Sequence, residues 1–141
     1  MTYAPQGRGV IDTNVVILLP RLTDPAALPA EPAITAITLA ELSAGPLVAA
    51  TDAERVSRQA HLQQAEADFD VLAFDGPCAR VFGRIVADLR SAGRKTTARA
   101  YDALIAATAV ANGLPLYTTN PDDYKGIADL QLAAVAHPDR S

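Results

Sequence analysis

Acidic side chains recur along this chain just beyond short apolar segments that are typical of β-strands. Asp12 comes directly after the first such segment, and Glu41 falls in the first turn after the second. Asp102 lies in a helical segment that is otherwise nearly uncharged, where aspartate is a poor helix former. The fourth segment is followed by three polar residues, Asn120, Asp122 and Asp123. In a parallel sheet these side chains would gather at the carboxyl ends of the strands, where α/β folds bind their ligands.

Carboxylates that share one crevice repel each other unless a cation neutralises them. The sequence offers few nitrogen or sulfur ligands, because it has one cysteine and two histidines. Oxygen ligands of this kind suit Mg²⁺ or Mn²⁺, and Mg²⁺ leaves coordination positions open for substrate phosphate oxygens. Such an ion activates water and stabilises the charge of an in-line displacement at phosphorus. The acidic residues therefore predict metal-assisted hydrolysis of a phosphodiester or phosphate ester.

Most of these residues also have a purely structural interpretation. Asp12 is suited to cap a helix that begins just after it. The pair Thr38 and Glu41 fits a capping box, in which the glutamate reaches back to the threonine amide. Asn120 followed by Pro121 is a favourable helix start, and one of the two acids behind it is expected only to complement the helix dipole. The combination of residues, more than any one of them, favours a functional site.

The elements that must position these side chains alternate between strand and helix. Near-continuous apolar runs predict strands covered on both faces, at residues 10–11, 33–37, 71–74, 116–118 and 130–135. Helical spacing of apolar residues predicts helices at 51–68, 77–91 and 97–112, the last ending before Gly113 as its C′ residue. A loop rich in proline and alanine is expected at 24–32. This alternation predicts an α/β fold with a mostly parallel sheet.

Length and composition indicate one folded domain over residues 1–141. With 141 residues, of which 50% are hydrophobic and 20% charged, the chain can bury one core but not two, and is not disordered. The single cysteine, Cys78, excludes an internal disulfide. The net charge of −4 argues against nucleic-acid binding through bulk positive charge, but not against a nuclease that recruits metal ions. Without a signal peptide or a membrane-spanning segment, we expect a cytoplasmic protein with no membrane partner.

Positive charge is concentrated just before Asp102, at Arg94, Lys95 and Arg99. These side chains are candidates to contact the phosphates of a nucleic-acid substrate near the acidic residues. A solvated face is the alternative explanation for part of this positive charge.

Four motifs resemble those of the PIN domain family and, within it, the VapC-type toxins of bacterial toxin–antitoxin pairs. They lie at residues 10–15, 37–42, 101–109 and 116–124, in the family's order and at similar spacing. The resemblance implies a three-layer α/β/α sandwich around a mostly parallel sheet of about five strands. It also implies an endoribonuclease that depends on Mg²⁺ or Mn²⁺.

The resemblance further implies which acids carry out catalysis. Asp12, Glu41 and Asp102 match the three principal acidic positions of the family. The fourth position is assigned to Asp123, although Asn120 stands where an acid can also lie. Thr13, Thr118 and Asn120 would then be polar supports of the carboxylates.

In the mechanism that this assignment implies, Asp12 and Asp102 hold the main metal ion. Glu41 orients or deprotonates the attacking water, and Asp123 helps to hold a second, weaker ion. The expected partners are an RNA substrate, a cognate antitoxin that covers the acidic crevice, and a second copy of the chain in a homodimer.

Two other function classes remain open. A phosphatase that uses an aspartate nucleophile after the first strand would need a second aspartate two residues later, where Asn14 stands. A catalytically degenerate PIN-like domain, acting only by binding protein or RNA, is kept open by the amide at Asn120.

Overall fold

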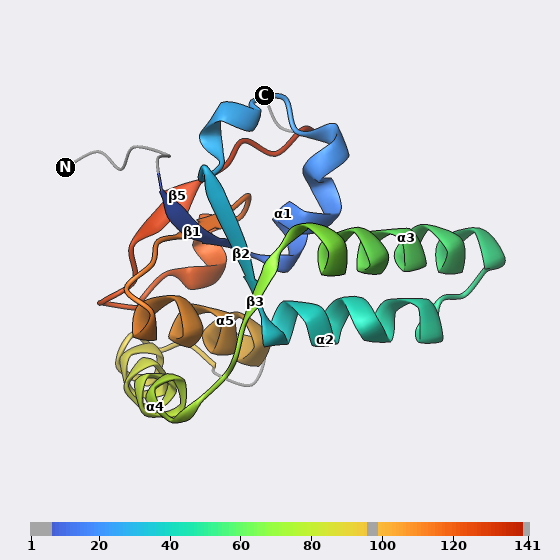
Figure 1. Ribbon diagram of the computed structural model, residues 1–141. Helices are drawn as coiled ribbons and strands as arrows, with labels where there is room; N and C mark the ends of the chain where they lie inside the picture. The colour runs from blue at the N-terminus through green and yellow to red at the C-terminus, as the bar shows by residue number, and fades with distance from the viewer. Residues whose placement is uncertain (1–6, 96–98, 140–141) are drawn as a thin grey trace.

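Five parallel strands form the centre of the fold, in the order β3-β2-β1-β4-β5. The computed structural model describes residues 7–95 and 99–139 (Figure 1). The strands are β1 (Arg8–Ile11), β2 (Glu31–Thr35), β3 (Asp70–Leu72), β4 (Leu116–Thr118) and β5 (Leu132–Ala134). Val10 of β1 aligns with Ala33 of β2 on one side and with Leu116 of β4 on the other. Because the strand order reverses between β1 and β4, their carboxyl ends form the switch point at which such sheets bind ligands.

Helices cover both faces of this sheet, which confirms the predicted three-layer α/β/α arrangement. They are α1 (Thr13–Leu18), α2 (Ala36–Ala44), α3 (Asp52–Asp68), α4 (Gly76–Ser91) and α5 (Ala100–Ala111). Short 3-10 helices are η1 (Leu19–Arg21), η2 (Pro25–Ala27), η3 (Gly45–Val48) and η5 (Pro121–Tyr124). In the described residues, no helix is both long enough and apolar enough to cross a lipid bilayer.

The two faces of the sheet bury separate apolar clusters. On one face, Val10 and Leu116 pack with α4 and α5 residues such as Ile85 and Ile105. On the other face, Ile11 and Tyr117 pack with residues of α1, α2 and α3. Alternate residues of β1 thus point to opposite sides, so the strand is covered on both faces as its apolar sequence predicts.

Element boundaries follow local capping more than apolar runs. The second strand was expected at 33–37, but it ends at Thr35, whose hydroxyl accepts a hydrogen bond from the Thr38 amide at 3.2 Å and caps α2. The strands expected at 71–74 and 130–135 are likewise shorter, as β3 and β5. Helix α5 ends as predicted before Gly113, which has a φ of 67°. Residues 96–98 of the expected segment lie outside the described residues.

Helices α2 and α3, joined by η3, lie side by side and form an arm that extends away from the sheet (Figure 1). The arm brings the amino-terminal part of α2, which follows β2, and the middle of α3 to the same edge of the molecule as α1. This edge contains the carboxyl ends of β1 and β2.

Candidate active site

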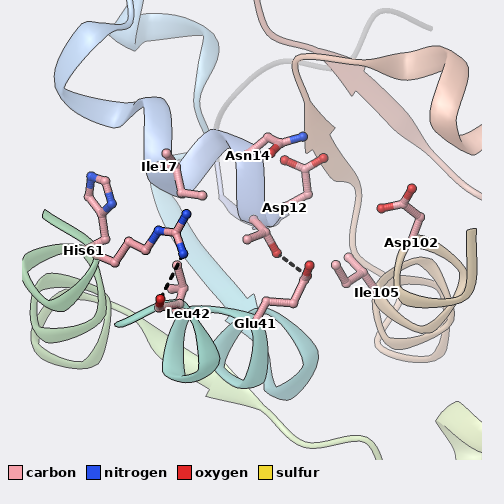
Figure 2. Close-up of a pocket in the computed structure, with 11 residues that line it drawn as sticks. Asp12, Asn14, Ile17, Glu41, Leu42, His61, Asp102 and Ile105 are labelled. Atoms are coloured by element: carbon pink, nitrogen blue, oxygen red, sulfur yellow. Dashed lines mark hydrogen bonds between the residues drawn. The ribbon is translucent and has the colours of Figure 1, made fainter. Parts of the chain in front are cut away.

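A pocket of about 310 Å³ opens beside the carboxyl end of β1 and collects three of the predicted acids (Figure 2). Asp12 enters it from the end of β1, Glu41 from α2 and Asp102 from the first turn of α5. Residues separated by up to 90 positions in the sequence therefore share one cavity. The apolar part of its wall includes Ile17, Leu42 and Ile105.

Asp12 both caps a helix and lines the pocket. Its side chain is buried, with 4% of the residue exposed. Oδ1 accepts a hydrogen bond from the Val15 amide at 3.0 Å, so Asp12 caps α1 as the structural interpretation expects. Oδ2 accepts a hydrogen bond from the Tyr124 hydroxyl at 3.2 Å. The carboxylate is thus held at both oxygens while it lines the pocket.

Glu41 is positioned by a pair of threonines and not by a capping box. The Thr13 hydroxyl donates to Glu41 Oε1 at 2.7 Å, and Thr13 Oγ1 lies 3.0 Å from Thr38 Oγ1. Because the Thr13 proton is used toward Glu41, the Thr38 hydroxyl donates to Thr13. The capping-box interpretation of Thr38 and Glu41 is therefore wrong, since Thr35 caps α2 and leaves Glu41 free to turn into the pocket.

The two aspartates lie in an electrostatic environment that disfavours their charged forms. Burial, together with the negative charges of Asp123 and Asp12, raises the pKa of Asp102 to about 6, while the positive charge of Arg99 opposes the increase. Burial also raises the pKa of Asp12, although hydrogen bonds from Thr118, Val15 and Tyr124 partly offset the increase. A cation bound between these groups would remove the repulsion.

The raised pKa of Asp102 predicts a pH-dependent loss of stability. Between pH 3.8 and about 6 the folded protein keeps a proton that the unfolded chain releases, so stability falls as pH rises through this range and stays lower above it. In EDTA, Asp102→Asn should therefore be more stable than wild type at pH 7.5 by about 1–3 kcal/mol, with the difference reduced to about a third of that at pH 4.5. Urea unfolding at both pH values measures this, and an equal difference at the two pH values would contradict it.

The structure separates the three candidates for the fourth acidic position. Asp123 lies close enough to influence the pKa of both Asp12 and Asp102, and it forms an ion pair with Arg99. Asp122 is exposed on η5. Asn120 precedes η5 and lines a neighbouring pocket with Asn14, Ile17, Leu18, Thr119 and His137.

Two side chains at the site make contacts that the sequence did not predict. Tyr124 is buried, and burial together with the nearby Asp12 raises the pKa of its phenol, so it stays a neutral donor to Asp12. Arg99, a candidate phosphate contact, forms an ion pair with Asp123. Arg94 also has an internal partner, since its guanidinium donates a hydrogen bond to the Lys125 carbonyl at 3.0 Å. The one signal in the sequence that pointed to Tyr124 was its position, as an aromatic residue directly after the candidate acid Asp123.

The donor set fits a hard divalent cation that retains water or substrate ligands. The pocket supplies carboxylate oxygens, and the pKa values of Asp12 and Asp102 are raised, so a bound cation would stabilise their charged forms. Among residues 7–95 and 99–139, however, no three acidic, histidine or cysteine side chains are grouped tightly enough to hold an ion on their own. This combination favours Mg²⁺ or Mn²⁺, since Mg²⁺ is commonly held by one or two carboxylates together with substrate phosphates.

Comparison with known proteins gives consistent matches. The profile of the PIN domain family matches residues 9–130. Ribonuclease VapC5 of Mycobacterium tuberculosis is 40% identical over 116 residues, which cover 81% of this chain and 84% of that protein. Ribonuclease VapC1 of Rickettsia felis is 30% identical over 133 residues, covering 92% of this chain and 98% of that protein.

Solved structures show the same likeness. The crystal structure of VapBC-5 from Mycobacterium tuberculosis, a member of the VapBC family of toxin-antitoxin systems, superposes with a TM-score of 0.79 at 36% identity. The match covers 91% of this chain and 98% of that one. VapBC2 from Rickettsia felis, crystallised with a DNA fragment, shares the fold with a TM-score of 0.72 at 24% identity, over 89% of this chain and 97% of that one.

Proposed function

Because this chain belongs to the PIN domain family and, within it, to the VapC ribonuclease toxins of toxin-antitoxin systems, we propose that it hydrolyses RNA phosphodiester bonds with metal-activated water. The observation that carries this proposal is the joint presence of Asp12, Glu41 and Asp102 in one pocket at the switch point of the sheet. The products would be a 5′-phosphate and a 3′-hydroxyl.

Asp12 and Asp102 are the residues we assign to hold Mg²⁺ or Mn²⁺, directly or through water. The ion, when bound, lowers the pKa of water and stabilises charge on the phosphoryl oxygens. Asp12 is already fixed by the Val15 amide and the Tyr124 hydroxyl, so its carboxylate needs little rearrangement. Asp102 gains most from a cation, because burial and its acidic neighbours oppose its charged form.

Glu41 is the residue we assign to orient and deprotonate the attacking water. Its Oε1 atom is held by the Thr13 hydroxyl, which in turn accepts from Thr38. This leaves Oε2 available toward the pocket. A carboxylate held on one oxygen by a neutral hydroxyl remains free to accept a proton on the other.

Asp123 is proposed to help hold a second, weaker ion. Its carboxylate already faces the Arg99 guanidinium, so this ion would compete with an internal cation. Thr118 supports Asp12 through its hydroxyl, and Asn120 supports the edge of the site because its backbone N–H donates a hydrogen bond to Thr118 Oγ1 at 3.0 Å.

A protein antitoxin is the partner we propose for the surface next to Glu41. A mostly apolar hollow there is lined by Ile37, Ala40, Glu41, Ala44 and Tyr101, and Tyr101 is 62% exposed. A segment bound in it would reach the acidic pocket, because Glu41 lines both cavities. The exposed Leu47, Val48 and Val56 on the arm are the surface we propose for a second copy of the chain. We place the activity in the cytoplasm, where RNA is available.

The test is cleavage of total bacterial RNA by purified protein in Mg²⁺ or Mn²⁺ and in excess EDTA. We expect cleavage that requires the metal, with 5′-phosphate ends. Undiminished cleavage in EDTA would refute the metal mechanism, and absence of cleavage under all conditions would favour the degenerate alternative. Trapping of an acylphosphate on Asp12 would favour the phosphatase alternative, which lacks a second acid at Asn14.

A further inference from the structure

The pocket that holds the three acids has a second, basic end. Arg58 and His61, both on α3, line the same cavity as Asp12, Glu41 and Asp102. In Figure 2, Asp102 lies on the right, Asp12 and Glu41 near the centre, and His61 on the left. Ile17 and Leu42 lie between the two ends. The cavity thus changes from acidic through apolar to basic along its length.

Arg58 and His61 stand on the inward side of a helix whose other polar residues are mostly exposed. They are spaced by three positions and are followed by Ala65, which is fully buried. Polar side chains on an inward face usually find an internal partner. Within the described residues, however, the imidazole of His61 has no hydrogen bond or ion pair.

Arg58 has a partial structural role that leaves most of its donors unused. One guanidinium nitrogen donates to the Gly45 carbonyl at 3.0 Å, and another forms a long ion pair with Glu54 Oε2, at 3.9 Å, on the same helix. In the described residues it forms no ion pair with an acid of the pocket. The charges that shift the pKa of Asp102 come from Asp123, Asp12, Arg99 and Glu41. The positive charge of Arg58 therefore remains available to a ligand at its own end of the cavity.

We propose that Arg58 and His61 bind the RNA phosphate next to the one being hydrolysed. This proposal rests on the proposed ribonuclease function, in which the scissile phosphate lies at the acidic end. The cavity of about 310 Å³ is at the lower limit of ligand pockets, about 300–1,000 Å³, and suits one nucleotide unit. The ribose and base would cover Ile17 and Leu42, so the substrate strand must be unpaired at this position.

This assignment also explains how an acidic protein binds a polyanion. The net charge is −4, and of the cations that precede Asp102 in sequence, Arg94, Lys95 and Arg99, none lines the pocket, while Arg99 is paired with Asp123. A fixed guanidinium and an imidazole donor on α3 would supply local attraction where the bulk charge does not.

The test measures RNA binding in a background in which cleavage is strongly reduced. In Glu41→Gln protein with Mg²⁺, the probe is a fluorescently labelled, random-sequence, single-stranded RNA 20-mer, and anisotropy gives Kd at several salt concentrations. We expect Arg58→Gln and His61→Gln each to raise Kd about three- to tenfold. Arg58→Gln should also reduce the slope of log Kd against log salt by about one. His61→Gln is the cleaner variant, because it removes no internal bond.

The matched control is Arg55→Gln, on the same helix. Arg55 is exposed and pairs with Asp52, and it does not line the pocket. We expect its Kd and salt slope to equal those of the background protein. Circular dichroism and thermal unfolding show whether each variant is folded.

Three outcomes are distinguishable. Equal Kd values and slopes for His61→Gln, Arg58→Gln and Arg55→Gln in folded protein would overturn the proposal. Unchanged RNA binding with weakened antitoxin binding would also overturn it, and would assign this end of the pocket to the protein partner. If wild type fails to cleave any RNA while the two variants still weaken binding, the proposed hydrolysis fails but the phosphate site stands.

Discussion

Replacing Asp12 with asparagine is expected to abolish RNA cleavage, with a loss of about a thousand-fold or more. Removing the charge withdraws the carboxylate proposed to hold the metal ion, and metal stabilisation of the transition state is worth several kcal/mol. Each 1.4 kcal/mol corresponds to a tenfold change in rate. Asparagine keeps an oxygen that can accept from the Val15 amide, so the cap of α1 and the fold should survive.

Initial rates of cleavage at saturating Mg²⁺ measure this effect, and circular dichroism measures the fold. The matched control is Asp122→Asn, which removes an exposed acid from the neighbouring 3-10 helix. It should retain wild-type activity. Activity of Asp12→Asn within tenfold of wild type would show that the reaction does not depend on this carboxylate.

Glu41→Gln is expected to lower kcat by about a hundred-fold while leaving KM nearly unchanged. Glutamine retains the acceptor oxygen for the Thr13 hydroxyl but cannot take a proton from water. General-base catalysis contributes about 10²–10⁴ in rate. The proposed metal-holding residues, Asp12 and Asp102, are untouched, so metal binding should persist.

Steady-state cleavage at saturating Mn²⁺ separates the two parameters. Thr13→Val gives a graded comparison, because it removes the hydroxyl that holds Glu41 but leaves the carboxylate. We expect it to reduce kcat less than Glu41→Gln does. A Glu41→Gln variant with normal kcat and raised KM would instead assign Glu41 to substrate binding.

The sheet was largely predictable because buried parallel strands are read from their apolar runs. The strand at Leu116–Thr118 and the predicted end of α5 before Gly113 are reproduced. The end of β2 was less predictable, since a run of apolar residues continues into α2. There the Thr35 hydroxyl, which caps the helix, decides where the strand stops.

Asp12 and Glu41 could be singled out by their places after strands, and Asp102 by its place in a nearly uncharged helix, but their partners could not be predicted. Glu41 matched a capping box on sequence alone, yet its hydrogen bond comes from Thr13, 28 positions away. Arg99 looked available to phosphate, yet Asp123 meets it from a different segment. Such pairings depend on which elements become neighbours in the fold, and local spacing does not encode that.

The basic end of the pocket escaped prediction for the same reason. Arg58 and His61 occur in a long, charge-rich helix where neither residue stands out from the sequence. They lie in the same pocket as the acids because α3 runs back along α2 in the arm (Figure 1). Local sequence gives the charge, and tertiary structure gives its location.

Titration of the protein with Mn²⁺, followed by electron paramagnetic resonance of the free ion, tests the central claim most directly. Wild type and Asp122→Asn should bind the ion with equal affinity. Asp12→Asn and Asp102→Asn should each weaken that affinity at least about tenfold. Unchanged Mn²⁺ affinity in both of these folded variants would contradict a metal site formed by Asp12 and Asp102.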